Sequence, residues 1–410
     1  MRESEAKLST ATWTLADQAV VSLGNFLLNI QLARSLPISE YGVFALLFSL
    51  IFLLQHCSVA LLVYPMSMRV AAAGHGRETG LMSITVTLVG ACNLAFGILL
   101  AVAAVAAGRR DIALVAALFC IVWQVQDALR RCLMAEFRHR EAMIGDTITY
   151  LGQAAVVAIM VRRGVPTLSG ALLGMTCASL VGGLVQLRQL GLGRPQLGGL
   201  GKLLAEFWHV GRWAFVSGLM MHLRLQILPW SLTLTHGTAA TAAFQAALNI
   251  ANLTNPVLFG LCNTISSSTA RAKAGSDNRA AWERVQFYML LGAPIIAAYS
   301  VAVFAVPGLV LWLFYGPHSP YLAYDLAVRV IMVSIVVSYF ADTYSAFLYG
   351  ADEGRIATRL AFIGLVMAVG AAALVVPWAV VGAAMAMLLG NVARLLASCL
   401  SMRSVLRGRS

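Results

Sequence analysis

Apolar residues occur in long runs along this chain, and short stretches carrying Arg, Gly, Pro and acidic residues separate the runs. A helix needs about 20 mostly apolar residues to cross the hydrocarbon core of a membrane. We therefore predict twelve transmembrane helices, at approximately 12–33, 41–66, 80–107, 112–134, 142–161, 168–187, 213–235, 238–268, 285–314, 323–350, 357–376 and 379–400. The run at 285–314 is long enough to be tilted or to break at Pro307.

Polar residues recur at intervals of three or four within three of these runs, so each set lies on one helix face. The sets are Thr14, Gln18, Ser22, Asn25 and Asn29 in the first run, Gln245, Asn249, Asn252 and Asn255 in the eighth, and Ser338, Asp342, Ser345 and Tyr349 in the tenth. Polar groups in hydrocarbon are costly unless they face protein or water. The stripes indicate a water-filled cavity, with hydrogen bonding between packed helices as the alternative.

Charged residues inside the runs are the candidate site residues. Arg224 lies near the middle of the seventh run, where an Arg costs at least ~2.5–3.5 kcal/mol on insertion scales. We expect an anion to compensate it, either a carboxylate such as Asp17 or Asp342 or a bound phosphate, which matches the guanidinium fork. Arg329 lies closer to the predicted outer surface, so it either contacts ligand or extends its head group to water.

Asp17 and Asp342 are the candidate ion-coupling residues. A carboxylate enclosed by protein can exchange a proton when its surroundings change. The alternative is a static ion pair with Arg224 or Arg329. We expect the remaining substrate contacts from the stripes, namely from Gln18, Asn25, Asn29, Gln245 and Asn249.

The composition agrees with a chain that lies mostly in lipid. Of its 410 residues, 60% are apolar and 11% are charged, and the mean hydropathy is +0.81. Soluble domains carry about 25% charged residues, so soluble folds are excluded. The net charge of +12 does not indicate nucleic-acid binding, because most basic residues lie between the apolar runs.

The basic residues instead predict the topology. With the N-terminus inside, the inside connections hold 21 of the 29 Lys and Arg residues, and the outside connections hold 5. Lys and Arg near the ends of membrane helices stay in the cytoplasm. We expect both termini in the cytoplasm.

The chain also divides into two similar halves. A shift of about 200 residues aligns Trp13 with Trp213 and Phe44 with Phe244, and the longest polar connection lies between the sixth and seventh runs. We predict an all-α polytopic membrane protein of about 12 helices in two six-helix lobes around a central cavity. The predicted lobes are 1–190 and 213–410, joined by a cytoplasmic linker at 191–212.

Three further groups receive structural interpretations. The seven cysteines form no CxxC pair, so we expect packing roles and no metal or cofactor. Asp127 has the spacing of a helical ion pair with Arg130 and with Arg131, which favours an anchor at the membrane surface. An interfacial belt near an outer loop is predicted for Trp312, Tyr315, Tyr321 and Tyr324.

Enzyme motifs are absent from the sequence. It contains no GxxxxGK[ST] loop, no HExxH and no GxSxG, which argues against nucleotide hydrolysis by a P-loop and against common membrane hydrolases. We therefore expect a transporter rather than an enzyme.

The stretch NFLLNIQLARSLPISEYGVFAL, residues 25–46, resembles the opening of bacterial Wzx-type polysaccharide flippases, for O-antigen or exopolysaccharide, of the multidrug/oligosaccharidyl-lipid/polysaccharide exporter superfamily. The resemblance rests on the polar first helix, on Ala33 and Arg34, and on Glu40, Tyr41, Gly42 and Phe44. It implies that an undecaprenyl-pyrophosphate-linked oligosaccharide crosses the bacterial cytoplasmic (inner) membrane by alternating access, for surface polysaccharide biosynthesis. It also implies cavity cations, here Arg224 and Arg329.

The implied partners are the lipid-linked oligosaccharide, membrane lipid, and a polysaccharide polymerase with glycosyltransferases; nucleic acid is not among them. Two alternatives stay open. An ion-coupled small-molecule antiporter of the same superfamily would need uncompensated carboxylates, whereas a pyrophosphate carrier needs uncompensated Arg. A membrane polymerase or ligase of lipid-linked sugars would need a sizeable outer loop, and the outer connections are short.

Overall fold

The computed structural model describes the backbone of residues 2–72, 78–193, 195, 198–273, 278–351 and 353–406. Regular structure in these ranges is helical throughout. Eight helical runs in the described part of the chain are long and apolar enough to cross a membrane. The chain is therefore a multi-pass membrane protein with an all-α fold, as the apolar runs predicted.

The helices of the first half coincide with the first six predicted spans. They are α1 (Arg2–Ser35), α2 (Ile38–Ser58), α3 (Tyr64–Ala72), α4 (Thr79–Ala106), α5 (Arg110–Ala135), α6 (His139–Asp146), α7 (Gly152–Arg162) and α8 (Leu168–Leu190). Two π-helical turns, η1 (Val59–Val63) and η2 (Thr147–Leu151), join α2 to α3 and α6 to α7. The helix therefore continues without a break through each π-helical turn.

The helices of the second half coincide with the last six predicted spans. They are α9 (Leu200–His236), α10 (Thr238–Ala251), α11 (Asn255–Lys273), α12 (Asn278–Ala305), α13 (Pro307–Tyr315), α14 (Asp325–Gly350), α15 (Gly354–Ala371) and α16 (Val375–Leu406), with short 3-10 turns η3 (Asn252–Thr254), η4 (Pro320–Tyr324) and η5 (Ala372–Leu374). Pro307 begins α13 directly after α12 ends, so the predicted break there is confirmed. α16 kinks at Ala379, whose φ is 45°.

The chain forms two compact units. Unit 1 comprises Met1–Leu36 and Leu47–Leu219, and unit 2 comprises Pro37–Leu46 and Met220–Ser410. The division therefore falls inside α2 and inside α9. Residues 200–212, which the sequence analysis assigned to a linker, form the first turns of α9, because Leu, Lys, Ala and Glu are good helix formers.

Unit 1 packs α5 against α4 and α8, and α1 against α6 and α7. Its core includes Met82, Leu129, Cys132 and Phe207, all nearly inaccessible to solvent. Close approach of helices depends on glycine. A Cβ at Gly24 would lie 2.7 Å from Cβ of Tyr150, and one at Gly182 would overlap the hydroxyl of Thr149.

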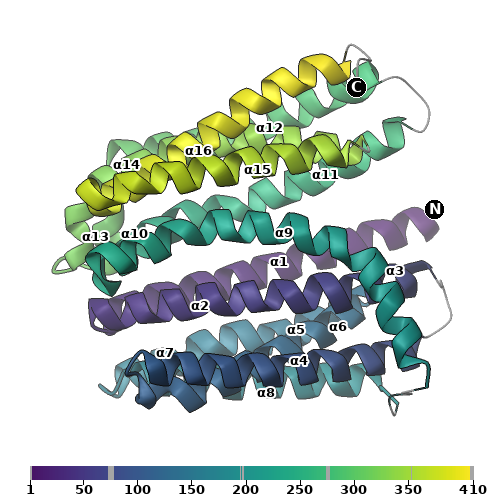
Figure 1. The fold of residues 1–410 in the computed structure, drawn as a ribbon, viewed down its shortest axis with the longest axis horizontal. Coiled ribbons are helices and arrows are strands. Elements are labelled where there is room, and N and C mark those ends of the chain that lie inside the picture. Colours follow the sequence, from purple (N-terminus) through teal and green to yellow (C-terminus); the bar gives the residue numbers. More distant parts are fainter. Residues whose placement is uncertain are drawn as a thin grey trace. The chain divides into compact units, whose positions relative to one another are not determined.

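Unit 2 packs α16 between α14 and α15, and α11 against α12 and α14; Figure 1 shows α15 and α16 side by side. The segment Pro37–Leu46 belongs to this unit. Tyr41 is fully buried there, and its hydroxyl accepts a hydrogen bond of 2.7 Å from Asn249 Nδ2. Tyr315 and Tyr321 are also buried, so the predicted interfacial belt is wrong for both.

We expect the substitution Gly182→Ala to destabilise unit 1, because the added methyl group would meet Thr149 and the carbonyl oxygen of Gly145 at 2.8 Å. Overpacking of this kind costs about 1–3 kcal/mol. Gly260→Ala is the control: its Cβ meets no atom within 4 Å, and Ala favours a helix. Thermal unfolding of the purified variants in detergent measures the difference, and equal midpoints would contradict the proposed close packing.

Candidate functional site

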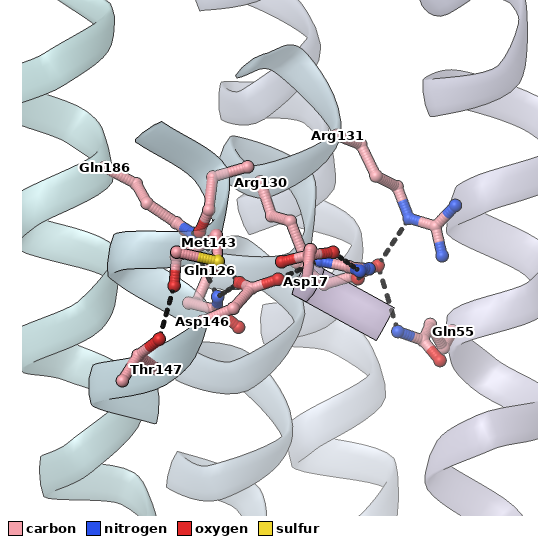
Figure 2. A network of polar contacts seen from close by, with 11 residues as sticks. Asp17, Gln55, Gln126, Arg130, Arg131, Met143, Asp146, Thr147 and Gln186 are labelled. Atoms are coloured by element: carbon pink, nitrogen blue, oxygen red, sulfur yellow. Dashed lines mark hydrogen bonds and ion pairs between the residues drawn. The ribbon is translucent and has the colours of Figure 1, made fainter. Parts of the chain in front are cut away.

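A cluster of five charged side chains lies inside unit 1, and we call it the acidic cluster: Asp17, Asp127, Arg130, Arg131 and Asp146. α1 contributes Asp17, α5 contributes Asp127 and both arginines, and α6 ends at Asp146. Figure 2 shows the side chains of Asp17, Arg130 and Asp146 pointing toward one another.

Arg130 lies at the centre of the acidic cluster. Its NH2 atom is 2.8 Å from Asp17 Oδ2, its Nε atom donates to Asp146 Oδ2, and its NH1 atom is 3.7 Å from Asp127 Oδ1. The guanidinium fork can bind two carboxylates at once because it carries donors on three nitrogens. One arginine thus holds together α1, α5 and α6.

Neutral amides complete the acidic cluster. Gln126 Nε2 and Gln186 Nε2 donate to Asp146 Oδ1 at 3.1 and 3.0 Å. On the other side, Asp127 Oδ2 accepts from Arg131 Nε at 2.7 Å and from Gln55 Nε2 at 3.0 Å. These amides fix the carboxylate orientations without changing the charge.

The charges of the acidic cluster do not balance. Three carboxylates face two guanidinium groups, and Arg131, which is 36% exposed, pairs with Asp127. Asp17 and Asp146 share Arg130. Oδ1 of Asp17 is buried and has no hydrogen-bond partner among the residues that the structure describes. With all three carboxylates ionised, the acidic cluster therefore carries one negative charge more than its two guanidinium groups balance.

The sequence analysis identified Asp17 but not its partners. It expected Arg130 at the membrane surface and expected Asp17 to pair with Arg224 or Arg329, if with any arginine. Arg130 is instead only 8% exposed. The spacing of Asp127 with its two arginines is confirmed, but Asp146 was missed although it is an acidic residue inside a predicted span.

A pocket in unit 2 contains Arg224, and we call it the arginine pocket. Its volume is about 100 Å³, and it is lined by Arg224, Leu225, Leu228, Phe244, Leu248, Ser338, Ala368, Ala386, Met387, Gly390 and Asn391. NH1 of Arg224 donates to Asn391 Oδ1 at 3.1 Å. In the part of the chain that the structure describes, no carboxylate pairs with this arginine.

Asp342 has a different arginine partner. NH2 of Arg394 lies 2.5 Å from Asp342 Oδ1, and Ser338 donates to Asp342 Oδ2 at 2.7 Å. Arg394 also donates to Asn391 at 3.4 Å. The sequence analysis gave Arg394 no role, and it paired Asp342 only with Arg224 or Arg329.

Gly364 leaves room for the side chains of Arg224 and Arg394. A Cβ at Gly364 on α15 would lie 2.6 Å from Cδ of Arg394 and 3.3 Å from Cδ of Arg224. The aliphatic parts of the two side chains therefore pack against the bare backbone of α15. Gly364 carries no chemistry itself, and sequence periodicity gave no sign of its role.

The other predicted residues lie apart from these two sites. Gln245 donates to Asn249, and Asn249 donates to Tyr41. Asn29 donates to the backbone oxygen of Asn25. The bond from Asn249 to Tyr41 joins two helices, as the packing alternative described, whereas the other two bonds lie within single helices.

Two of the predicted site residues, Gln18 and Arg329, take part in none of these hydrogen bonds. Gln18 is exposed. Arg329 lies over the ring of Phe304 at 5.8 Å, and its Nε atom is buried without a hydrogen-bond partner in the described part of the chain. The role of the polar stripes in a shared cavity stays a prediction. Within the described residues, no group of three or more His, Cys, Asp or Glu side chains could hold a metal ion.

Solved structures share this arrangement of helices. An inward-facing multidrug resistance MATE family transporter of the MOP superfamily is 18% identical, with a TM-score of 0.80 over 95% of this chain and 95% of that chain. An outward-facing conformation of such a transporter is 18% identical, with a TM-score of 0.68 over 98% and 96%. This chain has the MATE transporter fold.

A third similar structure is a MOP superfamily transporter from Pyrococcus furiosus. It is 17% identical, with a TM-score of 0.67 over 98% of this chain and 96% of that chain. Its binding pocket is described as having reverse polarity, which suggested a different function for that protein. No family model matches the sequence, and no curated protein matches it.

We expect Arg130→Gln to lower the stability of unit 1 strongly, because it leaves Asp17 and Asp146 buried without a counter-charge. Removing one partner of a buried ion pair costs about 3–5 kcal/mol. Arg131→Gln is the matched control, since a partly exposed pair contributes about 0–1 kcal/mol.

Thermal unfolding in detergent compares the two variants. Adding Asp17→Asn and Asp146→Asn to Arg130→Gln should recover part of the loss, because it removes the unpaired charges. Equal stability of the two single variants would show that Arg130 does not hold the acidic cluster together.

Proposed function

We propose that this chain is an ion-coupled transporter that exports small organic molecules across a membrane by alternating access. The MATE fold supports the transport class, since the solved structures that share it include inward-facing and outward-facing forms of multidrug resistance transporters. The excess negative charge of the acidic cluster supports the coupling, and it is the observation that carries this proposal.

The coupling follows from the cost of a buried charge. Asp17 is 0% exposed and Asp146 is 0% exposed, yet both rely on the one guanidinium of Arg130. A proton held between the two carboxylates, or a monovalent metal ion beside Asp17 Oδ1, would neutralise the site. If the cation binds more tightly in one transport conformation than in another, its gradient shifts the balance between them.

The π-helical turn η2 adds a structural reason for mobility at this site. It begins at Thr147, directly after Asp146, and π-helical turns inside α-helices occur frequently at functional sites. The wider turn leaves backbone groups less regularly paired than in an α-helix. A change in the charge of Asp146 would therefore act on a segment that can rearrange.

Reconstitution into liposomes tests the coupling. We expect a fluorescent organic cation such as ethidium, or a fluorescent organic anion such as calcein, to be moved by wild-type protein only when a proton or sodium gradient is imposed. Asp17→Asn and Asp146→Asn should each reduce gradient-driven movement by about tenfold or more, because an amide resembles a protonated carboxyl but cannot titrate.

The control for charge removal is Asp111→Asn. Asp111 forms an exposed ion pair with Arg109 at the start of α5, and its side chain is 56% exposed. We expect this variant to transport like wild type. Transport that depends on neither gradient would overturn the coupling proposal. Transport that is unchanged in Asp17→Asn and in Asp146→Asn would also overturn it.

A second candidate is translocation of a lipid-linked oligosaccharide in the cytoplasmic membrane of a bacterium. Arg224 favours it. In the described part of the chain, this guanidinium donates to the neutral side chain of Asn391 and pairs with no carboxylate. It can therefore bind a pyrophosphate. The resemblance of residues 25–46 to polysaccharide flippases supports the same substrate. On this proposal the polymerase and glycosyltransferases would be functional partners.

A flipping assay distinguishes the two candidates. A flippase should equilibrate a fluorescent polyprenyl-pyrophosphate disaccharide between leaflets within minutes, so that dithionite quenches nearly all of it rather than about half. Fluorescent phosphatidylcholine in the same vesicles is the control lipid and should stay half protected. Protection of half of both lipids would reject this candidate and leave the small-molecule exporter.

A further inference from the structure

α9 is longer than one membrane crossing requires. Its 37 residues form about 56 Å of helix, whereas the hydrocarbon core of a bilayer is about 30 Å thick. The apolar run at 213–235 is long enough for the crossing. The residues before it, 200–212, therefore lie at a membrane surface, and we call them the surface segment.

One face of the surface segment packs against the rest of unit 1. Phe207 is 1% exposed and shares a buried apolar cluster with Met66 and Val70 of α3. A Cβ at Gly211 would lie 2.5 Å from the carbonyl oxygen of Ala60. Figure 1 shows the start of α9 beside α3. These contacts hold the surface segment in place and leave its other face open to its surroundings.

The acidic residue of the surface segment is already paired. Glu206 accepts from NH2 of Arg69 on α3, so these two charges cancel. Lys202 and Arg212 have no carboxylate partner among the residues that the structure describes. Nε of Arg212 is buried and has no hydrogen-bond partner in the same part of the chain. The surface segment therefore carries two positive charges that no described carboxylate compensates.

These two cations share the open face of the helix. At about 100° per residue, positions 202 and 212 are each about 140° away from position 207. Position 209 is about 160° away, so His209 lies on the same face. Lys202 and His209 are exposed. The cationic face is therefore turned away from the buried Phe207.

Two exposed tryptophans border the cationic face. Trp208 is 55% exposed and Trp213 is 70% exposed. The guanidinium of Arg212 lies 5.6 Å from the centre of the Trp213 ring. Tryptophan is enriched at the level of the lipid head groups, where its ring meets both apolar and polar surroundings. The surface segment thus combines cations with the aromatic residues typical of a membrane interface.

We propose that the surface segment binds the head group of an anionic phospholipid, with Lys202 and Arg212 as its cationic contacts. The guanidinium fork of Arg212 matches two phosphate oxygens, and basic residues next to a bilayer attract anionic lipids. Trp208 and Trp213 lie at the boundary between head groups and acyl chains. This inference concerns the membrane partner and does not depend on the substrate that the protein transports.

A lipid fits this face better than an acidic protein segment does. Both would meet the charges of Lys202 and Arg212. The length of α9 places those charges at the depth of the lipid head groups, and the exposed tryptophans are suited to that depth. A water-soluble partner would gain little from either feature.

Equilibrium binding of short-chain lipids to the full chain in neutral detergent tests the proposal. Dioctanoyl phosphatidylglycerol is the anionic probe, and dioctanoyl phosphatidylcholine is the zwitterionic lipid with the same acyl chains. We expect the anionic lipid to bind about tenfold more tightly or better. Raising the salt concentration from about 0.1 M to about 0.5 M should reduce this preference, because salt screens exposed charges.

The double variant Lys202→Gln with Arg212→Gln removes both cations. We expect it to weaken phosphatidylglycerol binding by about tenfold to thirtyfold, and to leave phosphatidylcholine binding unchanged. The matched control is Arg162→Gln with Arg163→Gln, which also removes two exposed positive charges. These arginines precede α8, whereas the other end of α8 packs beside Phe207. We expect this control to bind like wild type.

Ala205→Glu is a second variant that keeps both cations. Ala205 is exposed and lies on the cationic face, three residues after Lys202 and four before His209. Glu is a good helix former, so the fold is preserved while a negative charge repels the head group. We expect weaker phosphatidylglycerol binding in Ala205→Glu and wild-type binding in Ala205→Gln.

Three results would overturn the proposal, whatever the transport assays give. The first is equal affinity of the wild-type protein for the two lipids. The second is the same loss of phosphatidylglycerol binding in both double variants, which would show a general effect of charge. The third is tighter binding of a hexaglutamate peptide than of phosphatidylglycerol, which would assign the surface segment to an acidic protein partner.

Discussion

A charge inside an apolar bundle must find a counter-charge close by, and this constraint organises both units of the protein. The cost of leaving a guanidinium or carboxylate unpaired in such surroundings is several kcal/mol. In unit 1, Arg130 meets Asp17 and Asp146, which come from two other helices. In unit 2, Arg394 meets Asp342 across α16 and α14. The pairs Arg130–Asp17 and Arg394–Asp342 therefore join helices that are not consecutive, whereas Arg130–Asp146 joins the consecutive helices α5 and α6.

The two sites deviate from neutrality in opposite directions. The acidic cluster has one carboxylate more than its arginines balance, and the arginine pocket has one guanidinium more than its carboxylate balances. A site of the first kind attracts a proton or a metal cation, and a site of the second kind attracts an oxyanion.

Neutral polar groups make these imbalances tolerable. Gln126 and Gln186 donate to Asp146, and Asn391 accepts from Arg224 and Arg394. An amide satisfies part of the hydrogen-bonding capacity of a charged group, which lowers the cost of burial. It leaves the charge itself available to a ligand. Glycine at position 364 contributes by shape alone, since the arginines pack where a side chain would otherwise lie.

The sequence by itself determined the membrane environment, the helical fold and the positions of the twelve helical runs, including the break at Pro307. These features follow from the length and spacing of apolar residues, which are local properties of the chain. The sequence also singled out Asp17, Arg224 and Asp342 as charges that need compensation. It could not choose their partners, because Arg130, Asp146, Asn391 and Arg394 come from helices far along the chain. Only tertiary packing decided that Asp17 meets Arg130 and that Arg224 meets an amide, since helix rotation and depth set which side chains come within hydrogen-bonding distance.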